Sequence, residues 1–238
     1  MSGQRHSLPN PAAAAEACAR RITGLLETAL EGAPWATLAV SGGTTPRLMF
    51  ERMAALRFDW SRVHLFWVDE RCVPPADPAS NYKLTKDWLL TAAHIPERNV
   101  HRIIGEIAPK EAAHRYEDEI RRFFSLEPGE MPNFDVVQCG MGPDAHTASL
   151  FPGETLIDDR AGIAAAVFAP QFNQWRVTLL PGPLLGARHV LYLVSGADKA
   201  EAVRAVFQGP REPKRFPAQL VGLAAEWFLD EAAAGLLQ

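Results

Sequence analysis

Two short segments hold side chains that could do chemistry. Residues 41–46 combine two glycines with three hydroxyl side chains, directly after an apolar, β-branched run. A strand-to-helix turn of this composition can point backbone N–H groups at an anion. Residues 142–152 place Asp144 two positions before His146, and such a pair suits proton transfer. Together the segments indicate an enzyme that binds a phosphorylated small molecule at one turn and moves a proton at the other.

Each segment also has a simpler interpretation. Residues 41–45 match neither the GxxxxGK[ST] nor the GxGxxG nucleotide pattern, so a tight turn before a capped helix would explain them equally well. Asp144 would cap a helix that begins near Ala145. The N-terminus of that helix disfavours an imidazolium and keeps His146 neutral, whereas the carboxylate acts in the opposite direction and can fix the ring tautomer. Alone, the Asp-x-His spacing is a weak signal.

Further charged residues lie at the ends of predicted strands. Asp69 and Arg71 face the same side of an extended segment, so one can orient a hydroxyl or proton while the other holds an anion. Glu70 between them is expected to be an exposed charge. Arg176 and Lys199 are candidate phosphate cations, although either one alone would be assigned to the solvated surface.

Hydrophobic periodicity predicts the elements that must position these groups. Strands are expected at residues 35–40, 63–68, 100–104, 134–139, 163–168, 176–180 and 190–194. Helices are expected at residues 12–30, 46–56, 81–93, 110–124, 184–187, 199–207 and 224–237.

This alternation predicts an α/β fold, Rossmann-like, with three α/β/α layers and a mostly parallel central sheet. Residues 1–238 are expected to form a single domain. In such sheets, ligands bind beyond the carboxyl ends of the strands. Residues 41–45, 69–71, 140–146 and 195–199 each follow a predicted strand, and this shared position is a stronger signal than any one motif.

Composition narrows the function further. A net charge of −4 without a basic stripe argues against nucleic-acid binding. Cys18, Cys72 and Cys139 form neither a CxxC pair nor a zinc-ligand cluster, which indicates reduced thiols and no structural metal. The sequence has no signal-peptide pattern and no membrane-spanning segment, so a cytoplasmic location is expected.

The chain resembles 6-phosphogluconolactonases of the pentose phosphate pathway over nearly its whole length. Five motifs occur in the order expected for that family. They are Ser41-Gly42-Gly43-Thr44-Thr45-Pro46; Trp67-Val68-Asp69-Glu70-Arg71 with Ser80-Asn81-Tyr82; Gly140-Met141-Gly142-Pro143-Asp144 with His146-Thr147-Ala148-Ser149-Leu150-Phe151-Pro152; Trp175-Arg176-Val177-Thr178-Leu179; and Ser195-Gly196-Ala197-Asp198-Lys199-Ala200.

The resemblance implies hydrolysis of 6-phospho-D-glucono-1,5-lactone, without a metal or organic cofactor. His146 would take a proton from water, Asp144 would orient the imidazole, and Asp69 would hold substrate hydroxyls or water. Arg71 or backbone N–H groups near Gly142 would stabilise the oxyanion. The phosphate would be bound by the first turn and two cations, namely Ser41, Gly42, Gly43, Thr44, Thr45, Arg176 and Lys199. A monomer and a homodimer both remain open.

One position departs from the family pattern, which usually has glycine where this chain has Ala145. If the backbone there needs a positive φ, alanine strains the turn by roughly 1 kcal/mol. Two alternative functions remain. Glucosamine-6-phosphate deaminases share the fold but place an Asn-Glu pair after the histidine, where residues 150–152 read Leu-Phe-Pro, and they tend to have an aromatic residue in place of Arg71. A non-catalytic sugar-phosphate sensor would normally carry a DNA-binding segment, for which the N-terminal region leaves no room.

Overall fold

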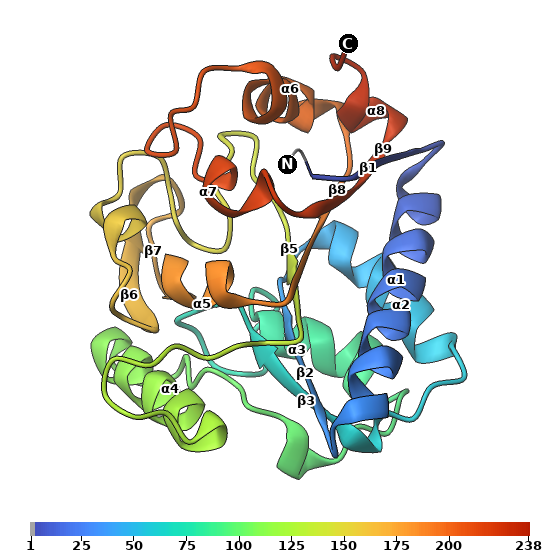
Figure 1. Cartoon of the computed structure of the whole chain (residues 1–238). Helices are drawn as coiled ribbons and strands as arrows, with labels where there is room; N and C mark the ends of the chain where they lie inside the picture. The colour runs from blue at the N-terminus through green and yellow to red at the C-terminus, as the bar shows by residue number, and fades with distance from the viewer. Residues whose placement is uncertain (1–2) are drawn as a thin grey trace.

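The computed structural model describes residues 3–238, and six parallel strands form its main sheet (Figure 1). Every neighbouring pair in this sheet is parallel. In spatial order the strands are β1 (Arg5–Leu8), β9 (Glu226–Asp230), β8 (His189–Val194), β5 (Val136–Cys139), β2 (Ala36–Val40) and β3 (Val63–Trp67).

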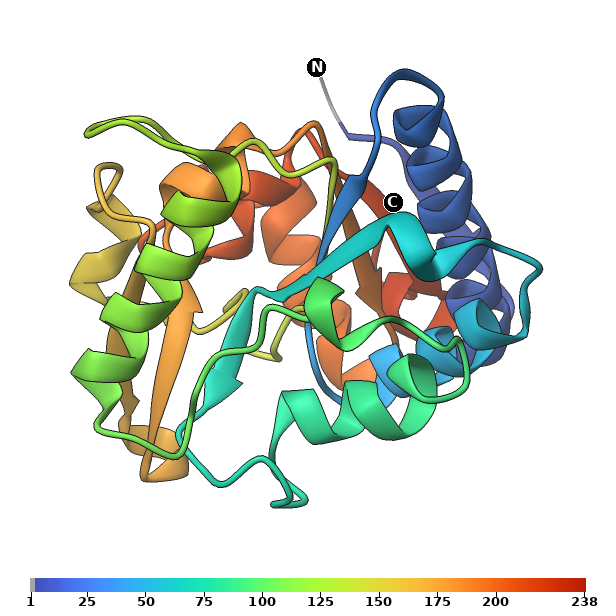
Figure 2. The same cartoon turned by 90° about the horizontal axis from the view of Figure 1, so that it is seen from below.

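Helices cover both faces of this sheet, as the sequence predicts. The long helix α1 (Pro11–Gly32) packs beside α2 (Thr44–Ala55), and α4 (Pro109–Phe124) packs against the strands β6 (Ala164–Ala169) and β7 (Gln174–Leu179). Figure 2 shows α1, in blue, and α4, in yellow-green, on opposite sides of the main sheet. The Rossmann-like three-layer α/β fold is therefore confirmed.

The remaining helices are short. They are α3 (Asn81–Thr85), α5 (Pro181–Gly186), α6 (Ala200–Gln208), α7 (Ala218–Gly222) and α8 (Glu231–Ala234), with a π-helical turn at Lys86–Leu90 and 3₁₀ turns at Trp60–Arg62, Glu97–Asn99, Thr155–Asp158, Pro170–Phe172 and Ala197–Lys199. Within residues 3–238, none of the helices combines the length and apolar character that crossing a bilayer requires.

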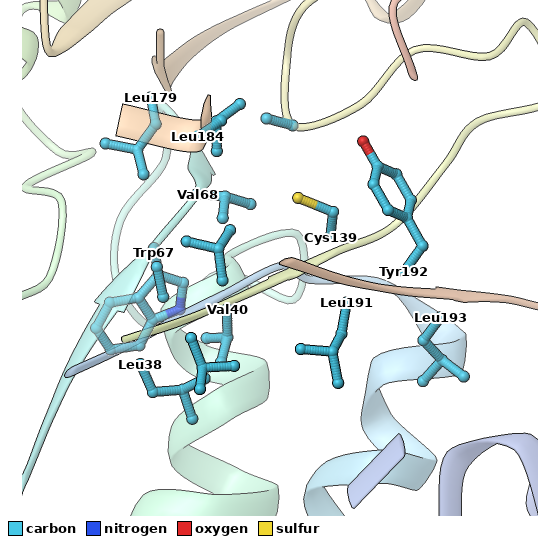
Figure 3. Packing of buried hydrophobic residues seen from close by; sticks show 14 of the residues in the cluster. Leu38, Val40, Trp67, Val68, Cys139, Leu179, Leu184, Leu191, Tyr192 and Leu193 are labelled. Atoms are coloured by element: carbon cyan, nitrogen blue, oxygen red, sulfur yellow. The ribbon is translucent and has the colours of Figure 1, made fainter. Parts of the chain in front are cut away.

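The core follows from strands that are apolar on both faces. All five residues of β2 are buried, which is typical of a parallel strand covered from both sides. Figure 3 shows Leu191 and Leu193 on one face of the main sheet, and Cys139 and Tyr192 on the other. Successive side chains of a strand alternate between faces, so each strand contributes to both layers of the core.

A second, antiparallel sheet branches from the first. It consists of β4 (Asp69–Arg71), β7 and β6, in that order. The chain leaves the main sheet after β3 at Val68, whose N–H donates to Val40 O at 2.9 Å and whose carbonyl accepts from Leu179 N at 2.7 Å. The register then places Arg71 opposite Arg176 in β7. The strands predicted at 163–168 and 176–180 exist, but they belong to this antiparallel sheet.

Three further elements differ from the sequence prediction. Residues 100–104 form a single bridge from Val100 to Leu65 and no strand, because the chain turns away at Gly105. The predicted helix at 224–237 is wrong, since its first half is β9 and only α8 is helical. Helix propensity is overridden there because Trp227-Phe228-Leu229 is buried beside β8 and β1. Strand β1 was not predicted, because it is short and sits at the edge of the sheet.

Glu70 is the strongest link between the second sheet and its surroundings. The sequence predicts an exposed charge, and this is wrong, because Glu70 is only 3 % exposed. Its carboxylate accepts hydrogen bonds from Arg71 N, Ser80 Oγ, Asn81 N and Tyr82 N at 2.7–2.9 Å. Burial raises the pKa of Glu70, while these hydrogen bonds act in the opposite direction. The side chain thus holds β4 against the start of α3.

His64 belongs to a row of titratable groups at the β3 edge of the main sheet. Its Nδ1 lies 2.9 Å from His101 Nε2, and His101 Nδ1 lies 2.8 Å from a carboxylate oxygen of Glu119 in α4. Burial lowers the pKa of His64 to about 4, and the charges of His101 and Arg98 act in the same direction. His64 is therefore neutral in the folded protein near neutral pH.

We expect Glu70→Gln to lower the free energy of unfolding by about 2–4 kcal/mol, because glutamine offers one acceptor oxygen and leaves buried N–H donors unpaired. Urea denaturation measures the loss. The control Glu106→Gln breaks a partly exposed ion pair with Arg102 and is expected to cost less than about 1 kcal/mol. Equal losses in the two variants would contradict the structural role of Glu70.

We also expect stability to fall as the pH drops from 6.5 toward 4, because His64 takes up its proton near pH 6.5 when unfolded and near pH 4 when folded. In this window the unfolded state binds more protons, and one residue contributes at most about 1.4 kcal/mol per pH unit. Urea unfolding at several pH values should show a shallower dependence in His64→Gln than in the wild type. The exposed His114→Gln serves as the control, and identical slopes in all three proteins would refute the prediction.

Candidate active site

The carboxyl ends of β2, β3, β5 and β8 meet at one cavity of about 530 Å³. This is the edge at which the sequence places its motifs. Of the predicted site residues, all except Asp144 line the cavity, and Asp144 contacts His146 from behind. The lining residues among them are Ser41, Gly42, Gly43, Thr44, Thr45, Asp69, Arg71, His146, Arg176 and Lys199.

The glycine turn connects β2 to α2 beside the cavity. The first N–H groups of a helix have no acceptor within the helix, and no side chain in residues 3–238 caps the start of α2. Gly42 lies so close to Asn81 that a Cβ built on it would meet Asn81 Oδ1 at 1.8 Å. The lack of a side chain therefore lets the turn pack against α3 while its amides stay near the cavity. This is the geometry expected of an anion site.

His146 is held by Asp144. The ring Nδ1 lies 2.5 Å from Asp144 Oδ1, and the same oxygen accepts from His146 N at 3.2 Å. An ionised carboxylate can only accept, so Nδ1 carries the hydrogen and Nε2 is left as an acceptor. Burial alone would raise the pKa of Asp144, but the hydrogen bond and the charge of His146 outweigh it and lower the pKa.

The backbone around this pair forms turns, so the helix predicted near Ala145 is wrong. Within residues 142–152 the pairing comprises a Gly142 N to His146 O hydrogen bond of 3.0 Å and a bridge between Thr147 and Leu150. Asp144 therefore does not cap a helix, and a helix dipole cannot keep His146 neutral. The N–H of Gly142 donates to His146 O within this turn. A Cβ on Gly142 would lie 2.1 Å from the His146 ring, so the glycine makes room for the imidazole.

Ala145 occupies the left-handed region with φ of 64°, which is the condition under which alanine strains the turn. Its amide donates to Gly142 O at 3.0 Å and its carbonyl accepts from Ala218 N at 2.9 Å. The methyl group is completely buried. Two hydrogen bonds and this packing therefore hold the strained residue in place.

Asp69 is buried at the inner wall of the cavity. Its Oδ2 accepts from Ser149 Oγ at 2.7 Å and lies 3.7 Å from an Arg176 nitrogen, while Oδ1 accepts from Asn81 Nδ2 at 3.2 Å. These contacts fix the carboxylate in one orientation. Asp69 can therefore receive a hydrogen bond from a ligand hydroxyl or water without first rearranging.

Three cationic side chains line the same cavity. Arg71 and Arg176 lie directly opposite each other in β4 and β7, where like charges repel. Burial lowers the pKa of Arg176; Asp69 opposes this shift and Arg71 adds to it. Lys199 follows β8 and contacts Asp198 through Nζ at 2.8 Å. Of the Asp and Glu side chains in residues 3–238, only Asp69 lines the cavity, against three cations, so the cavity favours an anionic ligand.

Four lining or adjoining residues were not assigned a role from the sequence. Asn81 and Ser149 lie inside recognised motifs, but only the fold shows that both bind Asp69. Ser195 Oγ is buried and finds no hydrogen-bond partner among residues 3–238. Phe172 lies in the turn between β6 and β7, and no pattern in the sequence marked it.

Neither the cysteines nor metal-binding clusters add to this site. Burial raises the pKa of Cys72 to about 11, so it is a protonated thiol and a poor nucleophile at neutral pH. Within residues 3–238, no group of three His, Cys, Asp or Glu side chains is placed to hold a metal ion.

Comparisons with known proteins place the chain in a family. The family model for glucosamine-6-phosphate isomerases/6-phosphogluconolactonase matches residues 9–229. The 6-phosphogluconolactonase of Haemophilus influenzae is 36 % identical over 209 residues, covering 84 % of this chain and 87 % of that protein. That of Synechocystis is 36 % identical over 200 residues, covering 83 % and 82 %.

A solved 6-phosphogluconolactonase structure from Trypanosoma cruzi is 26 % identical and superposes with a TM-score of 0.86, covering 100 % of this chain and 98 % of that one. The agreement therefore extends over the fold as well as the sequence. On these grounds the chain belongs to the glucosamine-6-phosphate isomerase/6-phosphogluconolactonase family.

Proposed function

We propose that this protein is a 6-phosphogluconolactonase, which hydrolyses 6-phospho-D-glucono-1,5-lactone to 6-phospho-D-gluconate in the oxidative branch of the pentose phosphate pathway. Relatives of that name match most of the chain. The observation that carries the proposal is that His146 and the uncapped N-terminus of α2 line one cavity. A base and an anion site so placed suit an ester whose far end bears a phosphate.

The phosphate binds where N–H groups and positive charge converge. The backbone N–H groups of residues 42–45 give the phosphate the partial positive charge of a helix N-terminus, and Lys199 and Arg176 each supply a full positive charge. Because Arg176 is only 6 % exposed, its charge is little screened by solvent. This end of the substrate is unchanged by the reaction, so its binding energy serves to position the lactone carbonyl.

The chemical step starts at His146 Nε2. This nitrogen accepts a proton from water while the water oxygen bonds to C1 of the lactone, and the carbonyl oxygen becomes an oxyanion that faces Arg71. The oxyanion then re-forms the carbonyl, the bond from C1 to the ring oxygen breaks, and His146 returns the proton to the departing oxygen. Asp144 holds Nδ1–H throughout and stabilises the imidazolium that forms between the two steps.

Asp69 is assigned to the substrate hydroxyls or to the attacking water. Ser149 and Asn81 fix its carboxylate, so it can accept a hydrogen bond in a defined direction. General base catalysis contributes roughly 10²–10⁴-fold and an oxyanion donor roughly 10²–10³-fold. These two contributions suffice for an ester that already opens slowly in water, and the proposed steps require only the side chains described.

The deaminase alternative is less well supported by the contacts of His146. A proton relay would need a carboxylate on the segment after the histidine. Here Phe151 occupies that segment and packs against the imidazole, with ring centroids 4.8 Å apart. An apolar ring in this place favours hydrolysis over a relay through a second acid.

We further propose that the enzyme works in the cytoplasm, because Cys18, Cys72 and Cys139 are all unpaired thiols. Its partner in the reaction is a small sugar-phosphate lactone. Every residue that the proposed chemistry uses comes from one chain, so a monomer and a homodimer could both carry it out.

The proposed function predicts fast clearance of the lactone. We expect the protein to remove 6-phosphogluconolactone, generated in place by oxidising glucose 6-phosphate, well above the spontaneous rate. The measurement follows lactone loss with and without protein, and ammonia release from glucosamine 6-phosphate is tested in parallel. Clearance at the spontaneous rate would refute the proposal, and ammonia release without lactone clearance would establish the deaminase instead.

We expect His146→Ala to lower turnover by at least about 10²-fold, because the general base is lost. Binding of 6-phosphogluconate should remain, since the anion site is intact, and calorimetry can measure it. His114→Ala, an exposed position in α4, is the matched control and should keep wild-type turnover. Near-normal turnover in His146→Ala would remove this residue from the role of base.

A further inference from the structure

Phe172 is an aromatic side chain that the mechanism above does not use. It lines the cavity, yet it is 52 % exposed, the most exposed of the large hydrophobic residues within 3–238. A phenylalanine at a cavity mouth leaves apolar surface in water that a bound ligand would cover. The position of Phe172 therefore indicates a role in ligand binding.

The turn that carries Phe172 has a defined geometry. It joins β6 to β7, and Asn173 in the left-handed region, with φ of 46°, donates from its N to Pro170 O at 3.1 Å. Side chains of a strand alternate, so Gln174 and Arg176 of β7 face the cavity while Trp175 points away. Trp175 instead pairs with Phe168 across the hairpin, with ring centroids 5.4 Å apart.

Phe172 lies over the cation that is proposed to bind phosphate. The Arg176 guanidinium carbon is 4.7 Å from the centre of the Phe172 ring and 5.6 Å from that of Phe151. The two rings are 6.2 Å apart, and Phe151 also contacts His146. Two aromatic rings thus connect the phosphate cation with the proposed base: Phe172, which lines the cavity, and Phe151, which is buried and does not line it.

We propose that Phe172 is a specificity-determining residue, whose ring packs on the C–H face of the substrate's sugar ring once the phosphate is bound. This inference rests on the proposed function. Phe172, Arg176 and His146 line the same cavity, and the apolar face of a pyranose ring is the part of this ligand that an aromatic ring can cover. A phenylalanine has no donor or acceptor for the phosphate itself.

A simpler role would be to shield Arg176 and thereby hold it in place. The two roles predict different losses. If Phe172 contacts the sugar, its removal weakens binding of the sugar phosphate and leaves binding of phosphate alone unchanged. If it acts only through Arg176, both ligands lose the same factor, because both depend on the guanidinium.

The experiment compares Phe172→Ala, Phe172→Leu and Phe172→Tyr with the control Phe168→Ala. Phe168 is a 38 % exposed phenylalanine in the same hairpin that does not line the cavity. Each variant is measured for kcat and KM on the lactone, and for calorimetric binding of inorganic phosphate and of glucose 6-phosphate, which has the ring and the phosphate but no lactone carbonyl.

We expect Phe172→Ala to raise KM about tenfold with kcat within about twofold, as for a contact made equally before and during reaction. The affinity for glucose 6-phosphate should fall by a similar factor, and the affinity for inorganic phosphate should fall by less than about twofold. The KM of Phe172→Leu should lie between those of Phe172→Ala and the wild type. The KM values of Phe172→Tyr and Phe168→Ala should match that of the wild type.

An unchanged KM in both Phe172→Ala and Phe172→Leu would overturn the proposal. An equal loss for phosphate and for glucose 6-phosphate would also overturn it and assign Phe172 to Arg176 instead. The wild-type protein is assayed first, and failure to clear the lactone at that stage would count against the proposed function rather than against Phe172.

Discussion

The site depends on one change of direction in the backbone. At Val68 the chain passes from the parallel sheet into the antiparallel one, because its N–H still pairs with β2 while its carbonyl already pairs with β7. Without this change, Asp69 and Arg71 would continue past the sheet edge into solvent. Glu70 stabilises this change of direction, since its buried carboxylate accepts from the N–H groups at the start of α3. A strand end becomes a cavity wall by means of backbone pairing and one buried charge.

The charged side chains of the cavity suit an anionic ligand, because cations outnumber carboxylates among the lining residues. Arg71 and Arg176 face each other across two strands, and Asp69 is the buried carboxylate between them and the motif that carries His146. Asp69 lies beside Arg176, and an anionic ligand would add to the negative charge that offsets the two arginines. The substrate brings a phosphate and, during reaction, a developing oxyanion. In the proposed mechanism, the cationic side chains of the cavity stabilise both groups.

The sequence predicts what depends on local pattern and misses what depends on distant pairing. The four motif segments were correctly placed at the carboxyl edge, because an apolar strand followed by small or charged residues is a local signal. The antiparallel sheet was missed, since nothing near Asp69 shows that it will pair with Thr178. The burial of Glu70 and the position of Phe172 at the cavity were missed for the same reason, since both depend on contacts between distant parts of the chain. The alanines near β9 favour a helix, so the sequence predicts a helix there. Pairing with β1 and β8 makes the segment a strand instead.

The loop around His146 shows how a wrong local prediction can leave the chemistry intact. A helix N-terminus would have kept the imidazole neutral by its dipole, and no such helix exists. Asp144 instead accepts from both the backbone N and Nδ1 of His146, so it fixes the ring and its tautomer directly. With Nδ1 bound to the carboxylate, Nε2 is the ring nitrogen left to accept a proton. Ala145, between Asp144 and His146, is in the left-handed region, so the backbone strain is located beside the proposed base.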